Sequence, residues 1–169
     1  MHKLFICTLL FDRCPAERVS SDTGKNIGVL VMIECFETTR KTSGGADIID
    51  ISSDVVDFVR KCGISEGCVV VFIPGSTAAV TTIEYESGAV DDLKRAIERM
   101  APRDISYAHD ARWGDGNGYS HVRAAMLGPS LCVPITGGDL ILGTWQQIVL
   151  CDFDNRPRTR RIVIQASGN

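Results

Sequence analysis

Short runs of β-branched and apolar residues, separated by turn residues, constrain the fold of this 169-residue chain more than any other feature. In the second half the turn stretches GPS, TGGD and DNRP separate such runs. Short, evenly spaced strands are typical of a sandwich or barrel and not of a parallel doubly wound sheet. The predicted strands there span 121–127, 131–135, 140–142, 147–153 and 161–166.

In two stretches nearer the N-terminus, apolar residues recur at the spacing of one helix face. The first is capped by Ser52 or Ser53 and ends at Gly63. The second spans 91–100 and ends before Pro102. We therefore predict an α+β fold, a β-sandwich of mixed sheets with two helices. Early strands are predicted at 29–38, 48–51, 68–73 and 79–85, the first two as a hairpin.

A readable pattern begins at Gly28, so we predict an N-terminal extension at 1–27 and a single domain at 28–169. Met32 is a candidate true start, and a chain truncated there should then express in soluble form. The apolar run at 4–11 follows one lysine, lacks an A-x-A site and is too short to span a bilayer.

Charge and cysteine usage indicate a cytoplasmic protein. The net charge of −3 provides no basic footprint, which disfavours nucleic acid and anionic membrane as partners. The number of cysteines, seven, is odd, and no CxxC pair occurs. Four of them lie in apolar runs and are predicted to be reduced, buried residues. These four are Cys35, Cys68, Cys132 and Cys151.

The most polar stretch of functional interest lies within 107–161. There, His109 and His121 flank a loop that contains Asp115 and Asn117. Imidazole and carboxylate groups suit a divalent metal such as zinc, although the histidine spacing of twelve matches no compact metal motif. The alternative is that both histidines cap loops through hydrogen bonds.

Three further polar groups have a structural alternative beside a functional one. Glu84 and Glu86 share one side of a predicted strand, which faces solvent, a partner or a site. Arg156 and Arg158 could bind phosphate, or could form a salt-bridged turn with neighbouring aspartates. Ser130, in the GPS stretch, belongs to an anion-binding nest or to a tight turn.

Four motifs in order resemble the YjbQ family, UPF0047, which is also called secondary thiamine-phosphate synthase enzyme. The resemblance extends from about Gly28 to Gly168. It implies a sandwich of mixed sheets with two helices, assembled as a homotrimer with a polar cavity near the subunit interface. The motifs are PGSTAAVTTIEYE (74–86), HDARWGDGNGYSH (109–121), LGPSLCVP (127–134) and LGTWQQIVLCDFDNRPR (142–158).

The resemblance implies a reaction on a small phosphorylated substrate. Hydroxymethylpyrimidine diphosphate and thiazole phosphate would be joined and pyrophosphate released, with a divalent metal (zinc or magnesium) assisting. We assign catalysis to Glu84, His109 and His121, and metal binding to His109, His121 and Asp115. The predicted substrate-binding residues are Asn117, Ser130, Trp145, Gln146, Arg156 and Arg158.

One departure from the family pattern affects the metal site. Many members have a histidine where this chain has Gly75, so a three-histidine site is weakened unless Asp110 or Asp115 compensates. Two other functions stay open: a metal-dependent hydrolase of unknown substrate, and a non-enzymatic trimeric ligand-binding or accessory protein.

Overall fold

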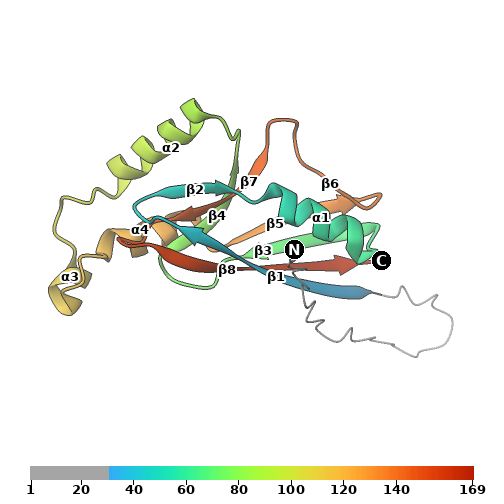
Figure 1. Cartoon of the computed structure of the whole chain (residues 1–169), viewed down its shortest axis with the longest axis horizontal. Helices are drawn as coiled ribbons and strands as arrows, with labels where there is room; N and C mark the ends of the chain where they lie inside the picture. The colour runs from blue at the N-terminus through green and yellow to red at the C-terminus, as the bar shows by residue number, and fades with distance from the viewer. Residues whose placement is uncertain (1–30) are drawn as a thin grey trace, which may run out of the picture.

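A computed structural model describes residues 31–169, and the predicted extension at 1–27 lies outside the described residues. Figure 1 shows how the helices and strands are arranged. In chain order they are β1 (Met32–Thr42), β2 (Asp47–Asp50), α1 (Ser52–Cys62), β3 (Glu66–Phe72), β4 (Ala78–Ile83), α2 (Ser87–Met100), α3 (Ala108–Trp113), α4 (Gly118–Leu127), β5 (Ser130–Thr136), β6 (Asp139–Leu140), β7 (Gln147–Asp152) and β8 (Arg158–Gly168).

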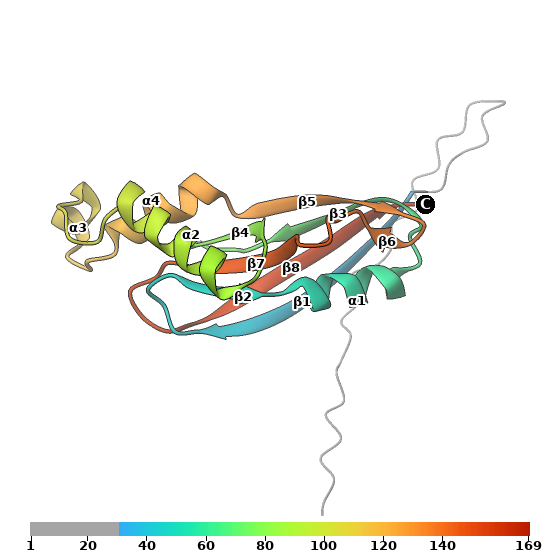
Figure 2. The same ribbon diagram turned by 90° about the horizontal axis from the view of Figure 1, so that it is seen from above.

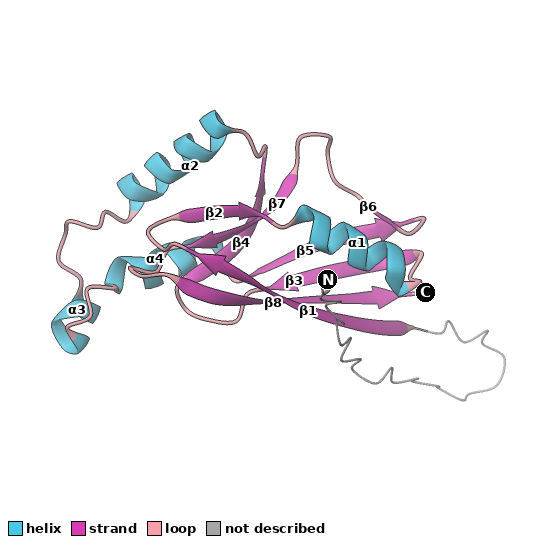
Figure 3. Cartoon of the chain, viewed as in Figure 1, coloured by secondary structure: helices cyan, strands magenta, loops and turns pink. Residues whose placement is uncertain are grey.

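The strands form two sheets, in the orders β1-β8-β3-β5-β6 and β2-β7-β4. The α+β class is confirmed. All the strand pairings described are antiparallel, however, where we predicted mixed sheets, and residues 31–169 contain four helices, not two. Figure 3 separates the helices from the strands. No helix in this part of the chain is long and apolar enough to cross a membrane.

Two apolar clusters build the layers. The first joins the inner face of the five-stranded sheet to α1 and to one face of the three-stranded sheet. The second joins the opposite face of the three-stranded sheet to α2 and α4, which lie along it in Figure 2. Strand β7 belongs to both, because Ile148 and Leu150 enter the first cluster while Val149 and Cys151 enter the second.

Helix α1 forms as its sequence predicts. Asp54 lies in its first turn and Arg60 and Lys61 in its last, which complements the helix dipole. Gly63 ends the helix with a φ of 80°, a conformation that glycine adopts without a steric penalty. Val55 and Val59 are one turn apart and buried.

The strand predicted at 121–127 is wrong, because these residues belong to α4. Tyr119, Ser120, Arg123 and Ala124 are buried with the spacing of one helix face. The apolar residues that suggested a strand include Val122 and Met126, which are exposed. The buried face of α4 is therefore partly polar, and its helical period was hidden in the hydrophobic pattern.

The hairpin predicted from 29–38 and 48–51 is also wrong, because β1 pairs with β8 and β2 pairs with β7. The turn between β1 and β2 sends the chain from one sheet to the other. Gly44, Gly45 and Ala46 all have positive φ, between 70° and 79°. The Gly45 and Ala46 amides donate to the carbonyl oxygens of Asp154 and Asp152 at 2.6 and 3.0 Å, so this turn packs on the end of β7.

Arg123 fastens α4 to the end of α2. Its guanidinium donates to the Ala101 carbonyl oxygen from Nε at 2.9 Å and to Glu98 Oε2 from Nη2 at 2.6 Å. The same group lies 4.8 Å from the centre of the Tyr119 ring. Arg123 is 1% exposed, so this buried cation is balanced by a carboxylate, a carbonyl and an aromatic face.

We expect Glu98 to make stability depend on acid pH. Burial raises the pKa of the Glu98 carboxyl. Hydrogen bonds from the Arg103 amide and from Arg123 outweigh this effect and lower the pKa from 4.5 to about 2. A carboxyl whose pKa is lower in the folded chain stabilises it fully above the unfolded value, and this stabilisation is lost as the pH falls from 4.5 to about 2. Glu98→Gln should flatten the fall in unfolding free energy over that interval.

The measurement is urea unfolding at a series of pH values. The matched control is Asp57→Asn, on the exposed side of α1. An acid dependence that is the same in Glu98→Gln as in the wild-type protein would refute this prediction.

Candidate functional site

Helices α3 and α4 bring the two predicted catalytic histidines together. His109 lies in the first turn of α3 and His121 in the first turns of α4, with their ring centres 4.4 Å apart and their planes tilted by 48°. Gly114 and Gly116 have φ values of 68° and 62°, which lets the connecting loop fold back on itself. Both imidazoles are half-buried.

Hydrogen bonds give the two imidazoles different roles. His121 Nδ1 lies 3.1 Å from the Ser76 carbonyl oxygen, which can only accept, so Nδ1 carries a proton, and in the neutral tautomer Nε2 keeps the lone pair. His109 Nε2 lies 3.4 Å from Asp115 Oδ2, a carboxylate that accepts the proton of that nitrogen. The pair therefore combines a proton acceptor with an imidazole whose cationic form has a carboxylate partner.

The loop that carries Asp115 is held from several sides. Burial raises the pKa of the Asp115 carboxyl, but hydrogen bonds from His109 and from the Asn117 amide outweigh this effect and lower the pKa. The Asn155 side chain donates to the Asp115 carbonyl oxygen at 2.8 Å, and the Gly118 amide donates to Asp110 Oδ1 at 2.8 Å. The carboxylate that faces His109 is therefore fixed on both sides of the loop.

Asn117 lies immediately before α4 and is 6% exposed. Its Oδ1 is buried without a hydrogen-bond partner among the residues that the structure describes. A buried acceptor of this kind is costly unless a ligand or water donates to it. The role of Asn117 in substrate binding stays a prediction.

A buried network of charges supports the segment that contacts His121. Arg160 binds Asp152 through two parallel hydrogen bonds of 2.6 and 2.8 Å, in the bidentate geometry that suits a guanidinium. Thr77 donates to Asp154 Oδ2 at 2.9 Å, and both aspartates are fully buried. Because Ser76 precedes Thr77, this network fixes the carbonyl that orients the imidazole of His121.

The arginines of the predicted phosphate-binding stretch differ in their surroundings. Arg158 Nε donates to Asp154 Oδ2 at 2.9 Å, which is the salt-bridged arrangement that the sequence left open. Burial raises the pKa of the Asp154 carboxyl, but hydrogen bonds from Arg158 and Thr77 outweigh this effect and lower the pKa. Arg156 is exposed and makes no ion pair with any of residues 31–169.

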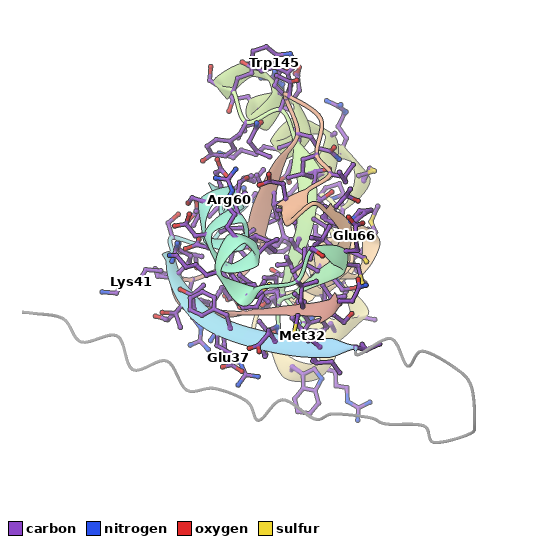
Figure 4. All side chains as sticks on the ribbon, turned by 90° about the vertical axis from the view of Figure 1, so that its right-hand side faces the viewer. Met32, Glu37, Lys41, Arg60, Glu66 and Trp145 are labelled. Atoms are coloured by element: carbon purple, nitrogen blue, oxygen red, sulfur yellow. The ribbon has the colours of Figure 1, made fainter. Side chains whose placement is uncertain are left out.

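Two other predicted site residues, Glu84 and Trp145, lie away from the histidine end of the three-stranded sheet. Ala78 pairs with Asp152 and Ile83 with Gln147, so β4 runs from the histidine end towards Glu84 over about 20 Å. Trp145 is 69% exposed and projects at the top of the molecule in Figure 4. One chain alone therefore does not bring Glu84 and Trp145 to the histidines.

Gln146 and Ser130 also lie away from the histidine pair. Gln146 accepts from the Gly143 amide and donates to Thr82 Oγ1, both at 3.0 Å, so its amide closes its own loop. Ser130 begins β5 and pairs with Phe72 of β3 in the five-stranded sheet.

Sequence reasoning missed Thr77, Arg123 and Arg160. The alternating charges of DFDNRPRTRR suggested a surface turn, but Asp152 continues the buried run of β7. A carboxylate that extends a buried strand requires a buried cation, and that requirement was the signal available for Arg160.

The fit of these residues to a metal ion is incomplete. Among residues 31–169, no group of three or more His, Cys, Asp or Glu side chains is arranged to hold one. His109, His121 and Asp115 therefore do not complete a ligand set within one chain. The divalent metal stays a prediction.

The fold and the site define an α+β protein with two antiparallel sheets and a paired-histidine loop. The family profile described as "UPF0047 protein YjbQ-like" matches residues 36–169. A UPF0047 protein of Archaeoglobus fulgidus is 40% identical over 132 residues, which cover 78% of this chain and 99% of the relative. One of Methanothermobacter thermautotrophicus is 38% identical, with 83% of this chain and 96% of the relative covered.

Solved structures give the same result. A YbjQ-like protein from Sulfolobus solfataricus superposes with a TM-score of 0.73 at 29% identity, covering 81% of this chain and 99% of that one. A yjbq/upf0047 family protein from Clostridium acetobutylicum gives 0.71 at 32% identity, with 78% and 98% covered. This chain belongs to the YjbQ-like UPF0047 family.

We expect the buried ion pair at the base of the site to carry much of the stability. Asp152→Ala leaves the Arg160 guanidinium buried without its main partner, which should lower the unfolding free energy by about 3 to 5 kcal/mol. Asp139→Ala, which removes an aspartate that is 61% exposed and pairs with Arg60, should cost at most about 1 kcal/mol. Urea unfolding measures both, and equal losses would contradict the prediction.

Proposed function

We propose that this protein is an enzyme of the thiamine-phosphate-synthase type, acting on a small phosphorylated substrate at the His109–His121 pair. The observation that carries the proposal is the hydrogen bonding of the two imidazoles. Ser76 leaves His121 Nε2 as a proton acceptor, while Asp115 supports the cationic form of His109. The family resemblance supplies the substrate class.

The reaction forms a bond between the thiazole nitrogen and the pyrimidine methylene carbon, and it breaks the bond from that carbon to pyrophosphate oxygen. Negative charge collects on the departing pyrophosphate. An imidazolium at His109, paired with Asp115, stabilises that charge. His121 takes up a proton from solvent on Nε2 and donates it to an oxygen of the departing pyrophosphate.

Neighbouring groups assist these two residues. Asn155 bonds to the loop of Asp115, so the exposed Arg156 that follows it stands on the turn beside the histidines. Its guanidinium suits a diphosphate oxygen pair. The unpartnered Oδ1 of Asn117 is suited to an amino or hydroxyl donor of the substrate.

We expect His109→Ala and His121→Asn each to lower the rate of thiamine phosphate formation at least about 100-fold, the usual contribution of a positioned acid or base. The measurement follows thiamine phosphate and released pyrophosphate with hydroxymethylpyrimidine diphosphate and thiazole phosphate as substrates. Circular dichroism and thermal unfolding confirm that each variant folds. Asp92→Asn, on an exposed position of α2, serves as the control with unchanged rate.

Glu84→Gln separates two arrangements of the site. Glu84 remains a proposed proton carrier, but it lies at the far end of β4 in its own chain. A loss as large as that of the histidine variants supports delivery of Glu84 by a neighbouring copy, whereas an unchanged rate removes Glu84 from the mechanism.

Other outcomes favour the alternatives. Unchanged turnover in His109→Ala would overturn the assignment of the site. Hydrolysis of phosphate esters that requires added zinc or magnesium, without condensation, would favour the metal-dependent hydrolase. Tight retention of a ligand without turnover would favour the accessory protein.

The homotrimer is also part of the proposal. Exposed apolar side chains such as Met126 and Trp145 support contact with further copies. Light scattering after gel filtration should then give a mass three times the 18.4 kDa of one chain. A mass of one chain at micromolar concentration would contradict the assembly.

A further inference from the structure

Two cysteines meet on the outer face of the five-stranded sheet. Cys68 lies on β3 and Cys132 on β5, where the register pairs Cys68 with Pro134 and Val70 with Cys132. The alternate residues Val69 and Val133 point into the core. Both thiols therefore project from the sheet on the side away from the core and stand diagonally across the two strands.

The hydrogen-bond pattern between β3 and β5 brings these two thiols close together. Pro134 has no amide hydrogen, and its carbonyl oxygen accepts from Ile141 on the β6 side. Cys68 and Pro134 therefore form a non-hydrogen-bonded pair, as do Val70 and Cys132 two residues on, and side chains lie closer together in such pairs. The right-handed twist of the strands brings the diagonal thiols nearer still.

The surroundings of the two thiols correct the prediction that they are buried. Of the four cysteines in apolar runs, Cys151 is buried, Cys35 and Cys68 are half-buried, and Cys132 is exposed. The Cys132 thiol is a neighbour of the Cys68 thiol across the two strands. Cys68 Sγ also lies 3.6 Å from the Ser167 hydroxyl on β8. A small ion can reach a pair with this exposure.

We propose that Cys68 and Cys132 form a two-thiolate binding site for one thiophilic monovalent ion of the copper(I) class. Soft thiolate sulfur selects copper(I) over harder ions. Zinc requires four ligands, and no group of three or more ligand side chains gathers anywhere in residues 31–169. On binding, each thiol releases its proton and forms one sulfur–metal bond, and no oxidation state changes.

The protonation of the site gives it a pH signature. Burial, and then the contact with Cys68, raise the pKa of the Cys132 thiol. The ion must therefore displace protons, so its affinity should rise with pH. The number of protons released per ion equals the number of the two thiols that are protonated before binding.

The experiment titrates the full chain with copper(I) under anaerobic conditions in competition with the chromophoric chelator bicinchoninate. We expect one ion per chain to resist the chelator. Cys68→Ser and Cys132→Ser should each weaken binding at least tenfold, while Cys62→Ser should leave it unchanged. Cys62 is a suitable control because it is also half-buried, on α1, and its thiol donates to the Val59 carbonyl oxygen instead.

Serine is nearly isosteric with cysteine, and circular dichroism checks the fold of each variant. Equal affinity of the wild-type protein and both serine variants at positions 68 and 132 would overturn the proposal. Equal weakening by Cys62→Ser or Cys35→Ser would also overturn it, because binding would then not belong to this pair. Loss of the ion from a Cys7→Ser, Cys14→Ser double variant would assign it to the N-terminal cysteines and refute the site.

Discussion

The pairing of Arg160 with Asp152 and Asp154 is the interaction on which the rest of the structure depends. Strand β7 enters both apolar clusters, and it runs directly into these two fully buried carboxylates. Charges in that position are tolerated only when a cation and hydrogen-bond donors meet them. Arg160 on β8 supplies the cation and so ties the end of the three-stranded sheet to the five-stranded one.

The same interaction connects the core to the candidate site. Thr77, bonded to both Asp154 and Arg160, holds the start of β4. The preceding carbonyl, of Ser76, then sets which nitrogen of His121 carries the proton. The orientation of the half-buried His121 imidazole is thereby determined by a buried network of charges, which is how a rigid framework fixes the geometry of a loop-borne site.

Local patterns in the sequence predicted the elements whose burial follows their own hydrophobic period. Helix α1, with its apolar face and its terminal Gly63, is an example. The loop between His109 and His121 was also recognised as a place where polar groups converge, because its glycines permit a reversal. Each of these two signals lies within a short stretch of the chain, so it can be recognised without information on tertiary contacts.

The predictions that failed concern features that depend on contacts between residues distant in the sequence. Helix α4 buries Arg123 against the end of α2, so its inward face does not look apolar in the sequence. The separation of β1 from β2 follows from a turn that bonds to residues more than a hundred positions later. Cys68 lies in a continuous apolar run. Only the position of β3 in a sheet with one face on the core and one face open shows that Cys68 points outwards.

The uneven anchoring of the two histidine-bearing helices has a consequence for motion. Helix α3 contributes no buried residue, whereas α4 buries half of its length against the sheet. His109 is therefore held mainly by hydrogen bonds to one loop, and its helix can open locally while the core and His121 stay in place. The histidine pair can thus separate and reform without global unfolding.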